Sequence, residues 1–321
     1  MTEPLVSVVI TSYNTGRFLP ETLDSALAQT HPRCEVILID DGSTDDTASI
    51  IQPYLTRVRY LRIAHAGLAA ARNRGLKMAS GDYVALLDAD DLWLPQKLAV
   101  QLEVARRNPT AGMIVCDGQE FGTPSSRPYL LSGAAATALR RSGGGEITGQ
   151  FHREFIKHVN IRCPAQTLLP RLVIEEVGPF GDFEAQDYDY YLRVSARFPV
   201  TFHSESLVQW RDREDSMSGP RVRRDLNWSR QKLKVLRAYA GVSQERHRQL
   251  IENQIIWNRA EVMFHCGELS KNRRASRGLI MLLRARLFPP MALPFVVASA
   301  APRVARFLHK MWSNRAGQGN E

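Results

Sequence analysis

Three carboxylates lie within four residues, directly after an apolar run in the first third of the chain. Residues 84–87 are typical of a buried strand in a parallel sheet, and Asp88, Asp90 and Asp91 follow it. Because side chains alternate along an extended chain, Asp88 and Asp90 point to the same side. Open α/β sheets bind ligands at the carboxyl ends of their strands. Two hard oxygen ligands there indicate a site for a magnesium or manganese ion, which would take further ligands from the phosphates of a substrate.

The third carboxylate has a second interpretation. Asp91 comes directly before Leu92, and an aspartate in front of a helix often serves as its N-cap. At this point the residues support both a metal-phosphate site and a simple helix start.

Alternating strand and helix patterns surround this stretch and position it. Strand patterns occupy residues 5–10, 35–39, 58–63, 84–87 and 112–116. Helix patterns occupy residues 18–27, 47–55, 67–75 and 95–108. This order predicts an α/β fold with a mostly parallel, doubly wound sheet and helices on both of its faces.

The turn after the first strand argues against two other nucleotide-binding classes. Residues 11–16 read Thr-Ser-Tyr-Asn-Thr-Gly, with a single glycine, so the G-x-G-x-x-G turn of a nicotinamide oxidoreductase is missing. A sugar nucleotidyltransferase would need a glycine-rich, basic phosphate loop, and residues 11–17 supply one glycine and one arginine. The nucleotidyltransferase therefore ranks as a weaker alternative.

Four motifs follow one another in a fixed order along the first ninety-one residues. They are Ser7-Val8-Val9-Ile10-x-x-Tyr13-Asn14, Asp40-Asp41-Gly42-Ser43-Thr44-Asp45, Gly67-x-x-x-Ala71-Arg72-Asn73-x-Gly75 and Leu87-Asp88-Ala89-Asp90-Asp91. In order and spacing they resemble the family 2 glycosyltransferases of the GT-A fold. The resemblance covers residues 5–218. It implies an inverting transferase that uses a nucleotide-diphosphate sugar and a divalent cation, manganese or magnesium.

The resemblance also implies roles for individual residues of these motifs. The base and ribose of the donor would be held by Thr11, Tyr13 and Asp40. Arg72 would support that pocket. Asp88 would face the ribose and the metal, and Asp90 would ligate the metal.

A later motif resembles the family's Glu-Asp pair at the start of an aromatic helix. Here the pair is Gln186-Asp187, so the aspartate is kept and the glutamate is not. Asp187 is the candidate general base that takes the proton of the acceptor hydroxyl, with Asp189 or Glu184 as substitutes. In the first turn of a helix, the dipole would keep Asp187 ionised by roughly 0.3–1 kcal/mol. The alternative is an acid that only caps this helix.

Residues 210–218 resemble the family's aromatic-Arg-x-His stretch. Arg213 stands where many relatives carry histidine, and an arginine contacts a diphosphate but cannot ligate a metal. With Gln186, this departure favours an alternative from another class, a catalytically inactive nucleotide-sugar-binding protein.

Two further segments have weaker signals. Residues 123–150 are rich in Gly, Ser and Ala, which predicts a flexible loop or lid. His152, His158 and Cys163 follow with irregular spacing, so we expect ordinary surface or core positions for them and no metal site.

The basic character of the chain belongs to its last fifty residues. Among 321 residues, 44% of them hydrophobic, the net charge is +9. Residues 271–321 hold ten Lys and Arg and one acid, Glu321, so they alone account for this charge. We expect three parts: a transferase domain over 1–220, a helical appendage over 221–270 and a basic, amphipathic tail over 271–321.

The tail predicts contact with an anionic membrane surface. Its cations flank an apolar stripe, the pattern of a segment that lies in a membrane interface. The alternative is that this stripe packs on the body of the enzyme. Nucleic acid is not expected as a partner, since its binders spread cations over the folded body. The uncharged run 287–302 is shorter than the roughly 20 residues of a spanning helix.

The expected setting is cytoplasmic, peripheral on the inner face of the cell membrane. The four cysteines are far apart, which fits a reduced compartment, and no secretory signal is expected at residues 1–4. By the resemblance, the acceptor would be a glycan or a lipid-linked molecule in cell-surface polysaccharide or glycolipid assembly.

Overall fold

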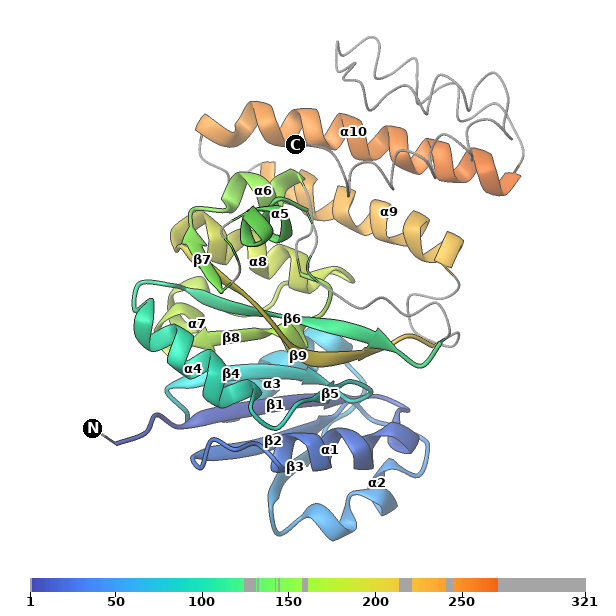
Figure 1. Cartoon of the computed structure of the whole chain (residues 1–321). Helices are drawn as coiled ribbons and strands as arrows, with labels where there is room; N and C mark the ends of the chain where they lie inside the picture. Colours follow the sequence, from blue (N-terminus) through green and yellow to red (C-terminus); the bar gives the residue numbers. More distant parts are fainter. Residues whose placement is uncertain are drawn as a thin grey trace. The chain divides into compact units, whose positions relative to one another are not determined.

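The computed structural model describes residues 2–123, 131, 133–141, 143, 145–157, 161–213, 221–240 and 245–270 (Figure 1). The chain divides into two compact units, Met1–Arg213 and Glu214–Glu321. The first unit contains the sheet and every predicted site residue. The expected boundary at residue 220 and the tail 271–321 lie outside the described residues.

One half of the sheet is parallel and runs in the order β3-β2-β1-β4. These strands are β1 (Val6–Ser12), β2 (Cys34–Asp40), β3 (Val58–Arg62) and β4 (Tyr83–Asp88). In this register Thr11 of β1 pairs with Asp88 of β4, and Ser12 pairs with Asp40 of β2. The carboxyl ends of three strands therefore meet at one edge, as the sequence predicted.

The other half of the sheet is mixed, because it contains both parallel and antiparallel strand pairs. Its strands are β5 (Leu92–Trp93), β6 (Met113–Phe121), β7 (Glu146–Gly149), β8 (Thr167–Pro170) and β9 (Val200–Arg211). Strand β8 is antiparallel to both β4 and β6, while β9 is parallel to β6 and antiparallel to β5 and β7. The short 3-10 helix Pro164–Gln166 leads into β8, so no crossover helix turns that strand parallel.

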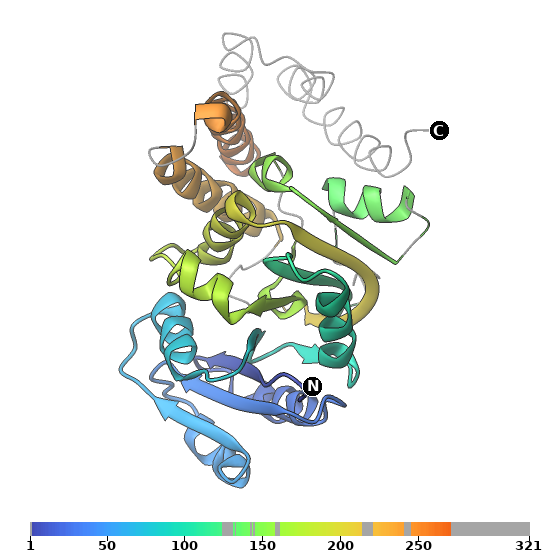
Figure 2. The same ribbon diagram turned by 90° about the vertical axis from the view of Figure 1, so that its left-hand side faces the viewer.

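Helices cover both faces of the sheet (Figure 2). On one face, Val8 and Ile10 of β1 share a hydrophobic cluster with Leu19 of α1 (Leu19–Leu27). On the other face, α3 (Leu68–Met78) packs so closely that a Cβ on Gly75 would come within 2.2 Å of Val9 Cγ1. The other helices of the first unit are α4 (Lys97–Arg107), α6 (His152–Lys157), α7 (Arg171–Val177) and α8 (Gln186–Arg197).

Two predicted segments differ from the structure. The helix expected over 47–55 is broken into α2 (Thr47–Ile50) and a 3-10 turn (Gln52–Tyr54), because Pro53 has no N–H to continue the helix. The segment expected as a loop over 123–150 contains α5 (Gly133–Arg141) and β7. Buried Ala135 and Leu139 explain the helix, since they give it an apolar face.

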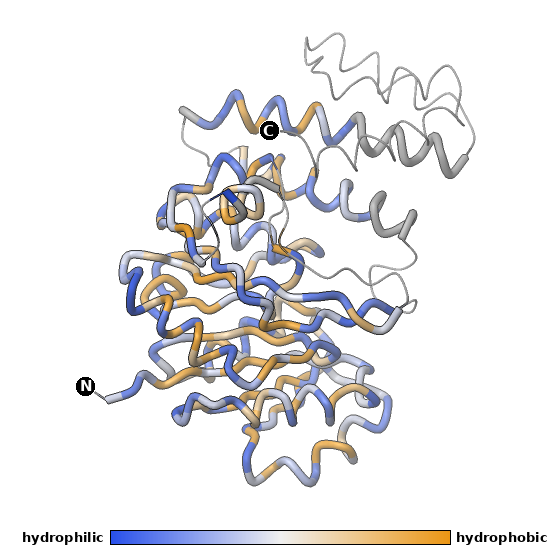
Figure 3. Tube along the Cα trace, viewed as in Figure 1, coloured by the Kyte–Doolittle hydropathy of each residue, from blue (hydrophilic) through white to orange (hydrophobic). Residues whose placement is uncertain are grey.

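The second unit contains two long helices, in the region where the sequence predicted a helical appendage. They are α9 (Arg221–Ala240) and α10 (Glu245–Ser270), with Leu236 and Ile251 buried. Figure 3 shows hydrophobic residues concentrated in the strands of the sheet, whereas both long helices alternate between hydrophobic and polar residues. Of the helices that the structure describes, none has the length and apolar character needed to cross a membrane.

Candidate functional site

The predicted site residues gather where β1, β2 and β4 end. Thr11 is buried at the end of β1, between Ile39 and Asp88 in the sheet register. Asp40 ends β2 and is fully buried. Since parallel strands bring their carboxyl ends to one edge, the fold places these residues together from distant parts of the sequence.

Asp40 fixes the loop that follows β2. Its Oδ1 accepts a hydrogen bond from the Ser43 amide, and its Oδ2 accepts one from the Tyr60 hydroxyl, both at 2.8 Å. Burial, together with the Asp40 carboxylate, raises the pKa of Tyr60 to about 12. The structure thus gives Asp40 a role in shaping the loop, while its contact with the base or ribose stays a prediction.

An aromatic pair lies beside this loop. Tyr13 is 44% exposed, and its ring stacks on His65 with centroids 4.2 Å apart and an angle of 20° between the planes. Asp41 holds the His65 loop: its carboxylate lies 2.9 Å from His65 Nδ1 and accepts the amides of Ala66 and Gly67 at 2.8 and 2.9 Å. An exposed aromatic platform of this kind suits a nucleotide base.

His65 and Asp41 had no role in the sequence-based prediction. Asp41 was visible in the second motif, but its partners on the 65–67 loop could not be deduced from spacing. Gly42 in the same turn has φ +76°, and a Cβ there would lie 2.9 Å from the His65 amide nitrogen. The glycine of the motif is therefore required for the close approach of these two loops.

Arg72 and Asp88 form a shielded ion pair. Arg72 Nη2 donates to Asp88 Oδ1 at 2.7 Å, and the arginine side chain is 3% exposed against 29% for the aspartate. Burial lowers the pKa of Arg72, but the carboxylates of Asp88 and Asp187 outweigh that and raise it above its usual value. The arginine thus stays charged next to two predicted site carboxylates.

Asp90 is paired with a residue from the end of β9. Arg213 Nε donates to Asp90 Oδ2 at 2.8 Å. Burial raises the pKa of Asp90, Asp88 raises it further, and Arg213 opposes both. The two predicted metal ligands therefore each accept a hydrogen bond from an arginine.

Asp91 is not a helix N-cap, because α4 begins after Gln96 and β5 intervenes. Its Oδ1 accepts the Arg211 amide at 3.0 Å, which ties the end of β9 to the turn after β4. Its Oδ2 is buried and has no hydrogen-bond partner among the described residues. Burial, with the neighbouring Asp90 and Asp88, raises the pKa of Asp91 well above its usual range.

Asp187 lies in the first turn of α8, as predicted, and is partly buried. The Tyr188 amide donates to its Oδ1 at 2.8 Å. Burial raises the pKa of Asp187, and Arg72 and this amide lower it only in part. Desolvation therefore outweighs the modest contribution expected from the helix dipole.

The two substitutes for this base have other surroundings. Asp189 is 8% exposed and pairs with Arg193 through both Nε and Nη2, at 3.0 and 2.9 Å. Arg193 also donates to the carbonyls of Val177 and Pro179, so Asp189 is part of a packing contact. Glu184 is exposed.

Two further polar groups lie on α8. The Tyr191 hydroxyl and Gln186 Oε1 are buried and have no hydrogen-bond partner in the described part of the chain. Burial and then the nearby Asp187 raise the pKa of Tyr191 well above its usual value. Unsatisfied polar atoms beside a candidate base are expected where a substrate completes the hydrogen bonds.

The donor set at the end of β4 fits a hard divalent cation. Asp88 and Asp90 offer carboxylate oxygens, and phosphate and water would complete the coordination. Within the described ranges, no three His, Cys, Asp or Glu side chains cluster to hold a metal. Buried His152 lies 3.0 Å from Ser195 Oγ, Cys163 is buried, and His158 lies outside the described residues.

Sequence comparison finds related glycosyltransferases. The chain is 27% identical over 247 residues to the glycosyltransferase GlyG of Streptococcus pneumoniae, covering 72% of this chain and 78% of GlyG. It is 46% identical over 106 residues to the putative teichuronic acid biosynthesis glycosyltransferase TuaG of Bacillus subtilis, covering 32% of this chain and 42% of TuaG. The chain thus spans less than two thirds of the length of several relatives.

Solved structures share the fold. TarS 1–349 of S. aureus, in complex with UDP-GlcNAc, matches with a TM-score of 0.59 and 18% identity, covering 88% of this chain and 87% of TarS. The mannosyltransferase PcManGT of Pyrobaculum calidifontis, in complex with GDP-Man and Mn²⁺, matches with a TM-score of 0.57 and 18% identity, covering 98% and 88%. Residues 7–168 match the family described as Glycosyl transferase family 2. This chain, with its GT-A-type fold, belongs to that family of glycosyltransferases.

Proposed function

We propose that this glycosyltransferase moves a sugar from a nucleotide-diphosphate donor to an acceptor hydroxyl with inversion at the anomeric carbon. The carrying observation is the cluster of Arg72, Asp88 and Asp187 at the carboxyl edge of the parallel strands, with the Arg72–Asp88 pair at 2.7 Å. In this cluster Arg72 is a buried cation, Asp88 is a proposed ligand of the metal ion at the diphosphate, and Asp187 is the proposed base. The structural neighbours bound to UDP-GlcNAc and GDP-Man support the donor class.

The donor base is assigned to the exposed face of Tyr13, which His65 supports from behind. Thr11 and Asp40 belong to the same edge, and they would border the base and ribose. In this arrangement the nucleotide meets loops that the protein already holds by its own hydrogen bonds, so little ordering entropy is lost on binding.

A divalent cation would be held by Asp88 and Asp90. When bound, it supplies positive charge against the diphosphate that leaves. The structural match to PcManGT, which was solved with GDP-Man and Mn²⁺, supports the use of a divalent cation.

Asp187 is the proposed general base. It takes the proton of the acceptor hydroxyl while the oxygen–carbon bond forms and the bond from the anomeric carbon to the diphosphate oxygen breaks. Because burial raises the pKa of Asp187, its carboxylate is a stronger base than an exposed one. The positive charge of Arg72 opposes this shift of the pKa and favours the ionised form of Asp187.

For the acceptor we propose a glycan or lipid-linked molecule of cell-surface polysaccharide assembly, with the basic tail at the inner face of the membrane. The relative TuaG, whose name refers to teichuronic acid biosynthesis, supports this setting. The charge of residues 271–321 supports the membrane contact.

A second candidate is a nucleotide-sugar-binding protein without catalysis. Gln186 in place of glutamate and the pairing of Asp90 with Arg213 favour it. The two candidates differ in turnover, since both bind donor but only the enzyme consumes it.

The deciding experiment incubates the full chain with a panel of UDP- and GDP-sugars and manganese, and measures release of the nucleoside diphosphate. We expect one or a few donors to be hydrolysed slowly without acceptor, and Asp187→Asn to abolish release while retaining donor binding. Binding without release by the wild-type chain would select the second candidate.

A further inference from the structure

Arg213, the last residue of the first unit, reaches a carboxylate that lies 123 residues earlier in the chain. Its Nε donates to Asp90 Oδ2 at 2.8 Å, and the two side chains are 18% and 19% exposed. The guanidinium also lies over the Phe18 ring, 5.1 Å from its centroid. Because both charges are largely shielded from water, their attraction is greater than that of an exposed ion pair.

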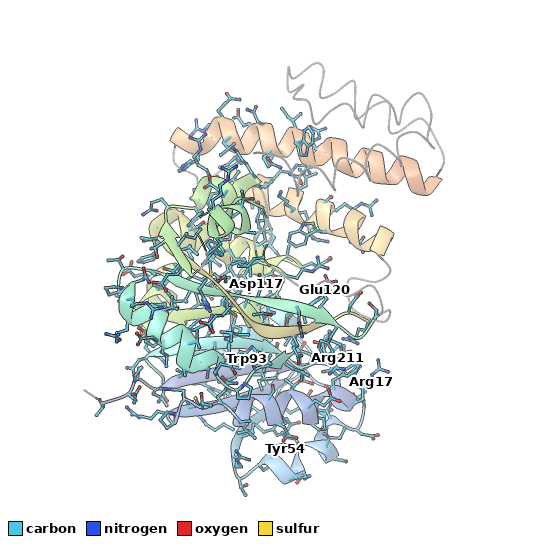
Figure 4. The ribbon with its side chains drawn as sticks, in the orientation of Figure 1. Arg17, Tyr54, Trp93, Asp117, Glu120 and Arg211 are labelled. Atoms are coloured by element: carbon cyan, nitrogen blue, oxygen red, sulfur yellow. The ribbon has the colours of Figure 1, made fainter. Side chains whose placement is uncertain are left out.

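Arg213 follows strand β9, which ends at Arg211 and positions it. The pairing of β9 with β5 brings Gln209 opposite Leu92. Beyond that pair, Arg211 donates its amide to Asp91 Oδ1 at 3.0 Å and its Nε to the Asp90 carbonyl at 2.9 Å. Figure 4 shows Arg211 and Arg17 at the same end of the sheet. These two hydrogen bonds from Arg211 hold the end of β9 against Asp90 and Asp91, so the pairing of Asp90 with Arg213 is a consequence of the fold.

The charges at the end of β4 are balanced by the protein itself. Arg72 pairs with Asp88, and Arg213 pairs with Asp90. An approaching divalent cation would meet two carboxylates that already have a positive partner. Of these partners, Arg72 is fixed within α3 at 3% exposure, whereas Arg213 is the more exposed and follows the end of its strand.

We propose that Arg213 is a resident counter-cation for Asp90, which a divalent metal ion must displace before Asp90 can ligate it. The inference rests on the proposed function, because it concerns the metal side of the same donor site. Arginine cannot ligate a metal, so Arg213 acts as a competitor of the ion and not as a fellow ligand. It lowers the affinity of the donor-free protein for the metal.

The test is a Mn²⁺ titration of the full chain without nucleotide, followed by electron paramagnetic resonance of the free ion. Arg213→Gln removes both the hydrogen bond to Asp90 and the positive charge that repels the ion. We expect it to bind Mn²⁺ at least about tenfold more tightly than the wild type, whereas Arg213→Lys, which keeps the charge, stays within about threefold.

Arg17→Gln is the matched control. Arg17 lies over the same Phe18 ring, 4.5 Å from its centroid. This variant therefore removes one positive charge near Arg213 while leaving the Arg213–Asp90 pair in place. We expect its Mn²⁺ affinity to match the wild type. Should Arg213→Gln lose its fold by circular dichroism, Arg213→Met makes the same comparison.

Equal Mn²⁺ affinity of wild type and Arg213→Gln, or an equal gain in Arg17→Gln, would overturn the proposal. So would a failure of every form to bind Mn²⁺. The proposed function is judged separately by calorimetry with UDP and GDP: if neither binds the wild type, the donor site is wrong, and the Mn²⁺ comparison still decides whether Arg213 blocks Asp90.

Discussion

In the parallel half of the sheet the protein satisfies its own buried polar groups, whereas the mixed half leaves several of them without a partner. Asp40 and Asp41 are each held by hydrogen bonds from neighbouring loops. Within residues 6–88, no buried side-chain nitrogen or oxygen lacks a partner. In the mixed half, the Tyr191 hydroxyl, Gln186 Oε1 and both ring nitrogens of His203 are buried without one in the described structure.

This difference separates two tasks. A saturated network keeps the donor-side loops in a single arrangement, so the nucleotide meets a preformed surface. A buried polar atom without a partner costs about 1–3 kcal/mol, and such atoms near Asp187 are expected where a substrate supplies the missing hydrogen bond. This contrast fits the proposed function, in which the donor binds at the parallel half and the general base lies at the start of α8.

The largest expected effect tests the chemical side. Asp187→Asn should lower the turnover number by about 10²–10⁴-fold while leaving donor affinity within a few-fold, because it removes a general base without removing a donor contact. Steady-state kinetics and calorimetry on the same preparation measure both quantities. Asp182→Asn, at an exposed acid of the same segment, is the matched control, and near wild-type turnover in Asp187→Asn would assign the base elsewhere.

The next effect tests the saturated network. Asp41→Ala should lower the free energy of unfolding by about 3 kcal/mol, because the amides of Ala66 and Gly67 lose a charged acceptor. Chemical denaturation measures the loss. Asp46→Ala, which changes an exposed residue near the same loop, should change stability much less. Equal stability of the two variants would show that the loop does not depend on its hydrogen bonds.

A buried amine in the mixed half gives a pH-dependent prediction. Lys97 is fully buried, with Nζ 3.3 Å from the Thr167 carbonyl and 3.8 Å from the Trp93 ring centroid, and burial lowers its pKa to about 8. Folding therefore favours the neutral amine. Burying the charged Lys97 amine destabilises the fold by its full amount below pH 8, where the amine is charged in both states. This destabilisation shrinks as the pH rises through 8. It disappears above the pKa of lysine in the unfolded chain, near 10.4.

Lys97→Met should accordingly stabilise the protein by about 2 kcal/mol at pH 7, with the gain fading towards pH 10. Thermal unfolding of both forms across this range measures it. Lys77→Met on α3, at an exposed side chain, serves as the control. A gain that stays constant with pH would mean that hydrophobic packing, and not the buried charge, explains the result.

The smallest effect concerns the aromatic platform. Tyr13→Ala should weaken binding of a nucleoside diphosphate by about 1 kcal/mol, or roughly fivefold, because it removes a stacking face. Tyr13→Phe keeps that face and should bind like the wild type in the same calorimetric titration. Similar affinities for the alanine and phenylalanine variants would place the base elsewhere.

Short-range patterns predicted the parallel half of the sheet and the position of its carboxylates. Strand ends followed by Asp40 and Asp88 were visible because apolar runs and motif spacing are local signals. Asp187 at the start of α8 was visible for the same reason. These residues needed no knowledge of which distant strands pair.

The mixed half depended on long-range pairing, which local patterns do not encode. The antiparallel direction of β8 follows from its register with β4 and β6, and the contact of Arg213 with Asp90 follows from the pairing of β9 with β5. The buried Tyr191 hydroxyl without a partner could not be predicted either, because spacing does not show whether a polar atom finds a partner.

The most direct test of the central claim is a calorimetric titration of UDP and GDP, with Mn²⁺ present, into the wild-type chain and into Asp88→Asn. Asp88 lies at the end of β4, pairs with Arg72 and is the proposed ligand on the diphosphate side of the donor site. Its neutralisation should therefore weaken binding of the preferred nucleotide at least about tenfold while the circular dichroism spectrum stays unchanged. Equal affinity in the two proteins would contradict a donor site at the end of β4.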